Sequence, residues 1–239
     1  METDLRVGSL TDVGKVREIN QDCYSIDSDN GLYVVADGMG GHLAGEKASR
    51  RAVEIICQEI AASGENSISS LQKAIQEANR AIVTQSLQDS SMRGMGTTVT
   101  AVLAQETELF VGHIGDSRAY LIRRGRIEQI TEDHSVVAQL LRARAITPQE
   151  AQRHPYRNVI TRCLGMQMEI EADTQHLPWQ KGDRILLCTD GLSGLVSDEE
   201  MASISSGSED PQEACQLMVD LALDRGGHDN VTVLILANE

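Results

Sequence analysis

The stretch from Leu32 to His42 reads LYVVADGMGGH, and it contains the pattern on which the rest of the chain is built. Five apolar residues predict a buried strand, Asp37 follows directly, and Gly38 then allows a close turn. Aspartates at Asp116 and Asp190 also follow apolar runs and lie beside glycine, and Asp229 immediately precedes another such run. The sequence therefore predicts strands whose ends carry carboxylates.

Carboxylates that a sheet brings together form a strongly negative pocket. Each raises the pKa of its neighbours, so the group does not stay ionised without cations. Mg²⁺ and Mn²⁺ prefer such oxygen ligands. A single Asp-Gly pair after a strand is typical of a hairpin turn, whereas four aspartates in equivalent settings favour a metal site.

The order of the predicted elements indicates the fold class. Strands come in hairpin-like order and helices in pairs, which argues against a doubly wound parallel sheet. We expect an α/β (α+β) fold, a four-layer α-β-β-α sandwich of two antiparallel sheets packed face to face and flanked by helix pairs. The predicted strands are Leu5–Leu10, Tyr24–Ile26, Leu32–Ala36, Thr97–Ala104, Leu109–Ile114, Ala119–Ile122, Arg184–Cys188 and Val231–Ala237.

Helical periodicity and capping residues predict the helices. Apolar spacing close to 3.6 residues marks Ala44–Ala62 and Leu71–Leu87. Thr147, Ser197 and Asp210 are each followed by residues typical of a first helical turn, and the helix after Asp210 should stop at Gly226-Gly227.

Composition limits the possible partners. The chain has 239 residues, 41% of them hydrophobic, and a formal net charge of −15. This size suits a single domain over residues 1–239, and the charge argues against binding nucleic acid or anionic membranes. The five scattered cysteines, the absence of a signal-peptide pattern and the absence of a long apolar run lead us to expect a cytoplasmic protein that is a monomer.

Eight motifs in order along the chain resemble the metal-dependent type 2C (PPM) Ser/Thr protein phosphatase family in its compact bacterial form. They span nearly the whole sequence. They are GKVREINQD (14–22), ADGMGGH with AGE and AS (36–49), MGTT (95–98), GDSRAYL (115–121), DHS (133–135), ITRCLG (160–165), GDRILLCTDGL (182–192) and GHDNVTV (227–233).

The resemblance implies a role for each matching residue. It implies that Asp37 bridges two Mg²⁺ or Mn²⁺ ions, that the Gly38 carbonyl binds the first, and that Asp190 and Asp229 hold the second. Asp22 acts through metal-bound water, and Asp116, with Asp190, corresponds to a weaker third site. Arg17 grips the substrate phosphate. Asn20 and Asn230 are expected to shape loops, and His134 to be a structural hydrogen-bonding residue.

The implied activity is hydrolysis of phosphoserine and phosphothreonine by a metal-bridging water, without a covalent intermediate. The implied partners are phosphoproteins and the Ser/Thr kinases whose action the enzyme reverses in bacterial signalling. The alternative is a catalytically weak module of the same fold that binds phosphoproteins. Cys188-Thr189-Asp190-Gly191 lacks the loop of a cysteine phosphatase, so Cys188 is expected in the core.

Two features of the sequence leave alternatives open. Met39 stands where eukaryotic-type relatives often have a histidine, so the general acid is either His42 or a water molecule. Residues 133–165 match the position of the family's flap and are rich in arginine. These arginines either guide an acidic phosphopeptide or form a solvated face, and Ala145 stands near the place of a small glycine in the family.

Overall fold

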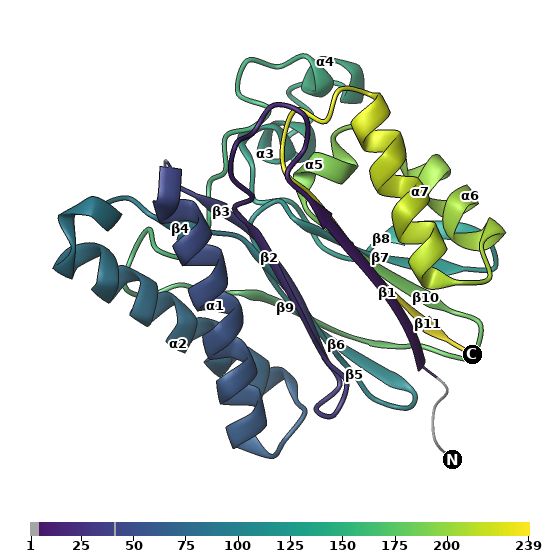
Figure 1. Cartoon of the computed structure of the whole chain (residues 1–239), viewed down its shortest axis with the longest axis horizontal. Coiled ribbons are helices and arrows are strands. Elements are labelled where there is room, and N and C mark those ends of the chain that lie inside the picture. Colours follow the sequence, from purple (N-terminus) through teal and green to yellow (C-terminus); the bar gives the residue numbers. More distant parts are fainter. Residues whose placement is uncertain (1–4, 41) are drawn as a thin grey trace.

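The computed structural model describes residues 5–40 and 42–239, and only the backbone of His42. Within this part of the chain, the strands form two antiparallel sheets, ordered β1-β11-β10-β7-β8 and β2-β3-β5-β6-β9, with β4 paired to β3 (Figure 1). The strands are β1 (Leu5–Asp12), β2 (Asp22–Asp27), β3 (Leu32–Met39), β4 (Gly96–Thr97), β5 (Val99–Ala104), β6 (Glu108–Ile114), β7 (Arg118–Arg123), β8 (Arg126–Gln129), β9 (Asp173–Pro178), β10 (Arg184–Cys188) and β11 (Val231–Asn238).

The helices of the described residues include long ones that cover the outer faces of the two sheets and short ones in the connecting segments. They are α1 (His42–Ser63), α2 (Ile68–Gln88), η1 (Ser90–Met92), α3 (Val136–Arg142), α4 (Pro148–Gln152), α5 (Asp190–Ser193), α6 (Asp198–Gly207) and α7 (Pro211–Asp224). In Figure 1, α1 and α2 cover the sheet that contains β3, and α6 and α7 cover the sheet that contains β11. The predicted α-β-β-α sandwich is confirmed.

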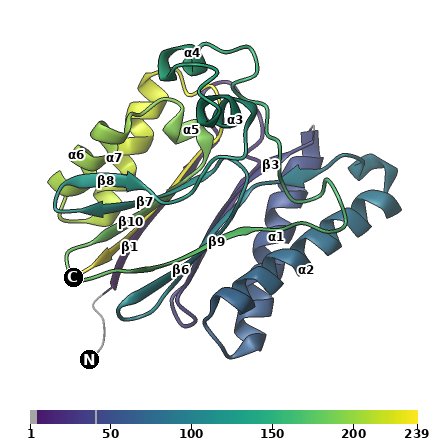
Figure 2. The same ribbon diagram turned by 180° about the vertical axis from the view of Figure 1, so that it is seen from behind.

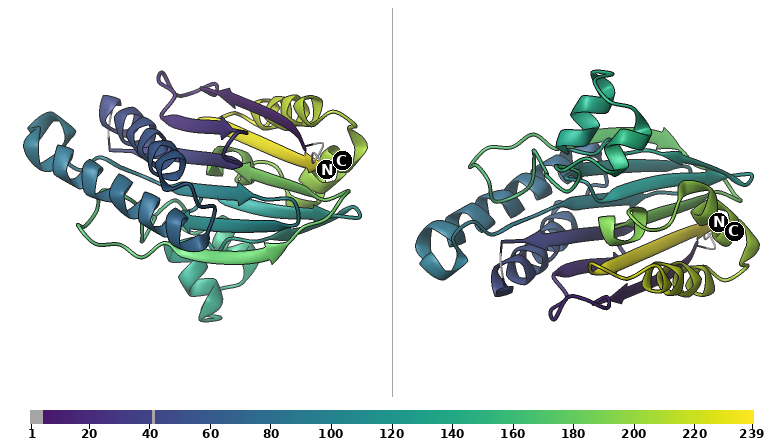
Figure 3. Two further views of the ribbon diagram at one scale, coloured as in Figure 1. Left: turned by 90° about the horizontal axis from the view of Figure 1, so that it is seen from below. Right: turned by 90° about the horizontal axis from the view of Figure 1, so that it is seen from above.

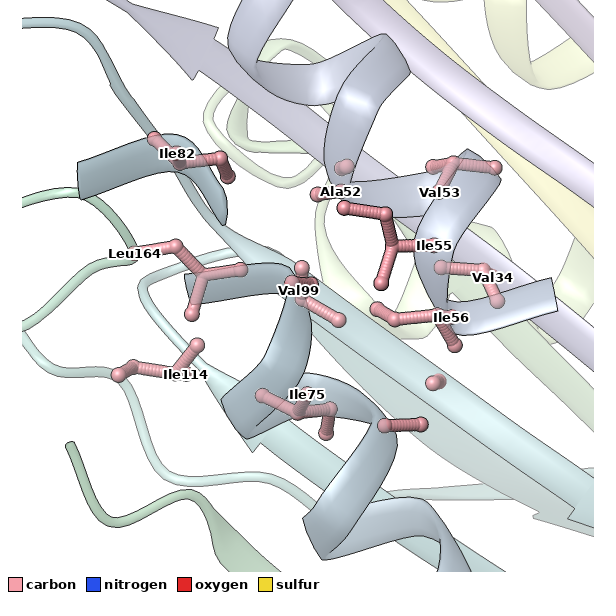
Figure 4. Close-up of a cluster of buried hydrophobic side chains, with 14 of the residues drawn as sticks. Val34, Ala52, Val53, Ile55, Ile56, Ile75, Ile82, Val99, Ile114 and Leu164 are labelled. Carbon is pink, nitrogen blue, oxygen red and sulfur yellow. The ribbon is translucent and has the colours of Figure 1, made fainter. Parts of the chain in front are cut away.

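Three layers of apolar side chains hold the sandwich together. One packs α1 and α2 against the sheet that contains β3 and includes Val34, Ile56 and Ile75 (Figure 4). A second lies between α7 and the other sheet, and a third, with Tyr33 and Leu234, fills the space between the sheets. Because β3 and β11 are buried on both faces, their sequences are continuous apolar runs rather than alternating ones.

The predicted helix starts are observed with their capping contacts. Thr147 and Ser197 each accept a hydrogen bond from the backbone N–H of the glutamate three residues on, and that glutamate bonds back to the cap. Asp210 caps α7, which ends at Asp224, just before the two predicted glycines. These caps satisfy N–H groups that the first turn of a helix leaves unpaired.

Several elements were not predicted from the sequence, namely β8, β9, α3, α5 and the one-turn η1. The strands β8 and β9 lie at the edges of their sheets, and their sequences, RIEQ and DTQHLP, are mostly polar. Edge strands expose one side of the backbone to water, so they do not need apolar runs. The α3–α4 region projects away from the sheets (Figure 3), and α3 has no buried residue.

No helix in the described residues has the length and apolar character needed to cross a bilayer.

Candidate active site

Two aspartates meet directly across the β2–β3 pair. Asp22, the first residue of β2, lies opposite Asp37 in the antiparallel register. Asp22 is buried, and its Oδ2 accepts hydrogen bonds from the hydroxyls of Thr189 (2.9 Å) and Thr232 (2.7 Å). These threonines belong to the β10 end and to β11, so Asp22 joins the two sheets at the site.

Asp190 and Asp229 enter the same site from the second sheet. Asp190 opens α5 directly after β10, and Asp229 precedes β11. Beyond the effect of burial, the negative charge of Asp190 raises the pKa of Asp37, as expected for two carboxylates held close together. The backbone around Asp37 is fixed, because its N–H donates to Thr98 Oγ1 at 2.8 Å and its carbonyl accepts from Thr97 Oγ1 at 2.8 Å.

Asp116 lies in the turn between β6 and β7. It is close enough to the cluster for the negative charge of Asp190, in addition to burial, to raise the pKa of Asp116. The turn depends on Gly115, whose φ is +118°, a conformation that side chains disfavour. His134 holds this turn through two hydrogen bonds. Its side-chain Nδ1 accepts from the Gly115 N–H at 3.0 Å, and its backbone N–H donates to the Gly115 carbonyl at 2.7 Å. The structural role expected for His134 is confirmed.

Burial and mutual repulsion raise the pKa values of four of these carboxyl groups. Burial raises the pKa of Asp22 to about 7, against the opposing hydrogen bonds from its two threonines, and that of Asp116 to about 8. Burial and the charge of Asp229 raise the pKa of Asp190 to about 6. The pKa of Asp37 is also well above its ordinary value, through burial and the charges of Asp22 and Asp190. Near neutral pH, the cluster must hold protons or cations.

The unpaired oxygens of the cluster fit a divalent cation. Oδ1 of Asp22, of Asp116 and of Asp190 is buried without a hydrogen-bond partner. An unpaired buried carboxylate oxygen is costly, and hard dications prefer such ligands. Among the residues that the structure describes, no three acidic, histidine or cysteine side chains are already gathered as a metal cage. The inference that this site binds metal rests instead on the buried carboxylate oxygens that have no hydrogen-bond partner.

Gly38 follows Asp37 where the chain passes close to α1. A Cβ at this position would lie 2.1 Å from the carbonyl oxygen of Gly45 and 2.7 Å from that of Gln21. Both contacts are shorter than any side chain tolerates, so only glycine fits here. Gly41 and the side chain of His42, the candidate general acid, lie outside the described residues.

Arg17 places a positive charge beside the carboxylates. Its Nη2 lies 2.7 Å from Asp229 Oδ2, and 52% of its side chain is exposed. The hydrogen bond to Asp229 raises the pKa of Arg17, and the charges of Asp37 and Asp190 add to the effect. The guanidinium thus lies at the open side of the carboxylate cluster.

Asn230 clamps the loop that carries Arg17. Its Nδ2 donates to the carbonyls of Val13 (2.9 Å) and Ile19 (3.0 Å), and its Oδ1 accepts from the Gln21 N–H at 2.8 Å. Asn20 contributes similarly, through Thr11 Oγ1 and the Asp22 N–H. The loop-shaping roles expected for both asparagines are confirmed.

Four hydroxyls that support the cluster were not singled out from the sequence: those of Thr97, Thr98, Thr189 and Thr232. Thr189 directly precedes Asp190, which was a local signal. Nothing in the sequence links Thr232 to Asp22, 210 positions away. Cys188 is buried in β10, as expected, and burial raises the pKa of its thiol to about 12, which disfavours a thiolate nucleophile.

The cluster opens onto a large groove. This cavity of about 1620 Å³ is lined by Arg17, Asp37, Gly38, Asp190 and Asp229, together with residues of α2 and of the segment before β9. The site is accessible to a large ligand and combines buried carboxylates with the exposed guanidinium of Arg17. Such a site can hold divalent ions and a phosphoryl group side by side.

Comparisons with known proteins agree with this chemistry. The protein phosphatase 2C family matches residues 15–222. The serine/threonine phosphatase stp of Listeria monocytogenes is 38% identical over 237 residues, which cover 96% of this chain and 94% of that protein. The serine/threonine protein phosphatase PstP of Mycobacterium tuberculosis is 40% identical over 97% of this chain and 44% of its own length.

Solved structures give the same result for the fold. A crystal structure of the M. tuberculosis phosphatase PstP/Ppp has a TM-score of 0.92 and 39% identity, covering 98% of this chain and 99% of the other. A structure of the PstP catalytic domain in complex with two manganese ions has a TM-score of 0.88 and 37% identity, with coverage of 98% and 97%.

Proposed function

The chain belongs to the protein phosphatase 2C family and is a metal-dependent serine/threonine protein phosphatase, and we propose how its residues divide the work. The observation that carries the assignment is the cluster of buried carboxylates with three unpaired oxygens, next to Arg17 and open to the groove. The relatives are named serine/threonine phosphatases, and one was solved with two manganese ions.

We propose that two Mg²⁺ or Mn²⁺ ions bind at this cluster. Asp37 would contact both, the Gly38 carbonyl would contact the first, and Asp190 and Asp229 would hold the second. Asp22 would act through water, since its Oδ2 is already held by two threonine hydroxyls. Asp116, with Asp190, would form a weaker third site. When bound, the ions supply a water molecule that loses its proton near neutral pH and can attack phosphorus.

The other roles fall to groups at the mouth of the site. Arg17 would bind the phosphoryl oxygens through paired N–H groups, exchanging its contact with Asp229 for the substrate. A phosphate dianion on a protein of charge −15 needs this local positive charge. The leaving serine or threonine oxygen takes its proton from His42 or from water. Comparing His42→Gln with wild type on substrates of different leaving-group pKa separates the two, because only loss of the acid penalises poor leaving groups.

We further propose that residues 1–239 act as one domain, that residues 133–165 form a flap beside the site, and that the enzyme is a cytoplasmic monomer. Its substrates would be proteins phosphorylated by Ser/Thr kinases. Two of the flap arginines are engaged in the structure, Arg142 with Glu132 and Arg162 with Asp173. These contacts support a structural role for part of the basic flap.

The assignment is tested with purified protein and p-nitrophenyl phosphate. Hydrolysis should require Mn²⁺ or Mg²⁺, and Asp37→Asn should lower kcat by about a thousandfold, equivalent to about 4 kcal/mol of transition-state stabilisation. Asp220→Asn, at an exposed position on α7, is the matched control and should retain activity. Hydrolysis that survives exhaustive chelation would refute the metal mechanism.

A further inference from the structure

The groove that contains the aspartate cluster continues beyond it to the end of α2. It is lined by Val83 and Leu87 of α2 and by Val159 and Met166 of the segment before β9. Residues 93–96 complete the lining. This extension, which we call the α2 groove, lies outside the carboxylate cluster.

A buried asparagine of α2 holds the part of the lining that comes from the segment before β9. Asn79, within α2, accepts a hydrogen bond from the Gly165 N–H at 2.9 Å and donates to the carbonyls of Gln167 (2.9 Å) and Met168 (3.0 Å). Figure 2 shows the segment that leads to β9 passing beside α2. Because one buried side chain satisfies three backbone groups, the α2 groove has a wall fixed before any ligand arrives.

The α2 groove exposes large apolar side chains. Leu87 is 77% exposed, Met166 63% and Val159 43%. Nine large hydrophobic side chains are exposed in the described residues, and four of them line this cavity: these three and Val16, next to Arg17. Apolar groups gathered in a groove are typical of a surface that binds another molecule.

A cation completes this surface. Arg93 lines the groove, is exposed, and has no ion pair or side-chain hydrogen bond within the described part of the chain. On a chain of charge −15, the positive charge of Arg93 in this groove favours an acidic group on the ligand.

We propose that the α2 groove binds the polypeptide next to the phosphorylated residue, selecting phosphoproteins with apolar side chains and an acidic residue at these flanking positions. The proposal rests on the proposed function, because the groove is continuous with the carboxylate cluster and with Arg17. The positions from Val83 to Gln88 span about 7.5 Å of helix, at about 1.5 Å per residue. Two to three extended residues, at about 3.3 Å each, match that length.

The test compares phosphothreonine peptides of otherwise identical sequence. Two peptides carry a Leu-Leu pair, on the amino or the carboxyl side of the phosphothreonine, and a third carries Gly-Gly on both sides. For wild type with Mn²⁺, one leucine peptide should have a kcat/KM about tenfold above the glycine peptide, mostly through KM. Tenfold is about 1.4 kcal/mol, which corresponds to about 55 Å² of buried apolar surface.

The double variant Leu87→Ser/Met166→Ser should reduce that ratio to within about twofold, and Arg93→Gln should remove any gain from adding an aspartate to the leucine peptide. The matched control is Leu217→Ser, an exposed leucine on α7, which should keep the wild-type ratio. Equal kcat/KM for the three peptides in wild type, or a ratio that survives the double variant, overturns the proposal while p-nitrophenyl phosphate is still hydrolysed. If neither that compound nor any peptide is hydrolysed, the proposed function fails instead.

Discussion

Replacing Asp22 by asparagine should stabilise the metal-free protein and at the same time impair the enzyme. Asparagine has the same shape and keeps an oxygen that can accept the hydroxyls of Thr189 and Thr232. It removes the charge that burial makes unfavourable. Burial raises the pKa of Asp22 from 3.8 to about 7 in the folded chain.

The sign of the pH dependence follows from that shift. A carboxyl group whose folded pKa is raised binds its proton more tightly in the folded state. The contribution of Asp22 to the free energy of unfolding is therefore highest below 3.8 and falls as the pH rises toward about 7. The gap between the two pKa values, at about 1.4 kcal/mol per pH unit, amounts to about 4 kcal/mol once both states are ionised.

The assay is urea unfolding of wild type and Asp22→Asn in the presence of a chelator. The variant should be more stable by about 4 kcal/mol near pH 8 and by about 2 kcal/mol near pH 5, where only the unfolded chain is ionised. Saturating Mn²⁺ should reduce or reverse the difference, because the ions stabilise the ionised cluster. A variant that is less stable than wild type at both pH values without metal would refute the reasoning.

Two further substitutions test other parts of the site. Arg17→Lys should raise KM for p-nitrophenyl phosphate about tenfold with a smaller change in kcat, because a lysine cannot form the paired N–H contacts with phosphate. Steady-state kinetics would measure both constants, and an unchanged KM would contradict the role of Arg17. Asn79→Ala should lower the free energy of unfolding by about 3 kcal/mol, since three backbone groups lose their partner. Urea unfolding measures this loss, with Gln76→Ala on the same helix as the control. Equal losses of stability in the two variants would contradict the role of Asn79.

The central strands could be predicted from the sequence because they are buried on both faces. Val34 and Val35 leave no doubt about β3, and helix starts with a capping box are equally local signals. The edge strands β8 and β9 carry no such signal, because their backbone groups pair on one side only and their side chains face water.

The acidic residues of the site could be predicted because each lies at the end of an apolar run or within a motif. Their support could not be. The Asp22 contacts to Thr189 and Thr232 join residues more than 160 positions apart, and a hydroxyl in a strand is also an ordinary strand residue. The Asn79 contacts to the segment before β9 are similar: the helical periodicity places Asn79 on the inner face of α2, but its partners are known only once the chain has folded.

The burial that makes the cluster costly also determines how it binds metal. Because Asp22, Asp116 and Asp190 have raised pKa values, each is partly or mostly protonated near neutral pH when no ion is present. A dication must displace those protons, so protons and metal compete, and metal affinity should strengthen as the pH rises through about 6 to 8. The same desolvation that raises these pKa values also strengthens the attraction between the ionised carboxylates and the dications. A site at the surface would avoid the cost of burial, but it would hold the ions less firmly and leave the attacking water less acidic.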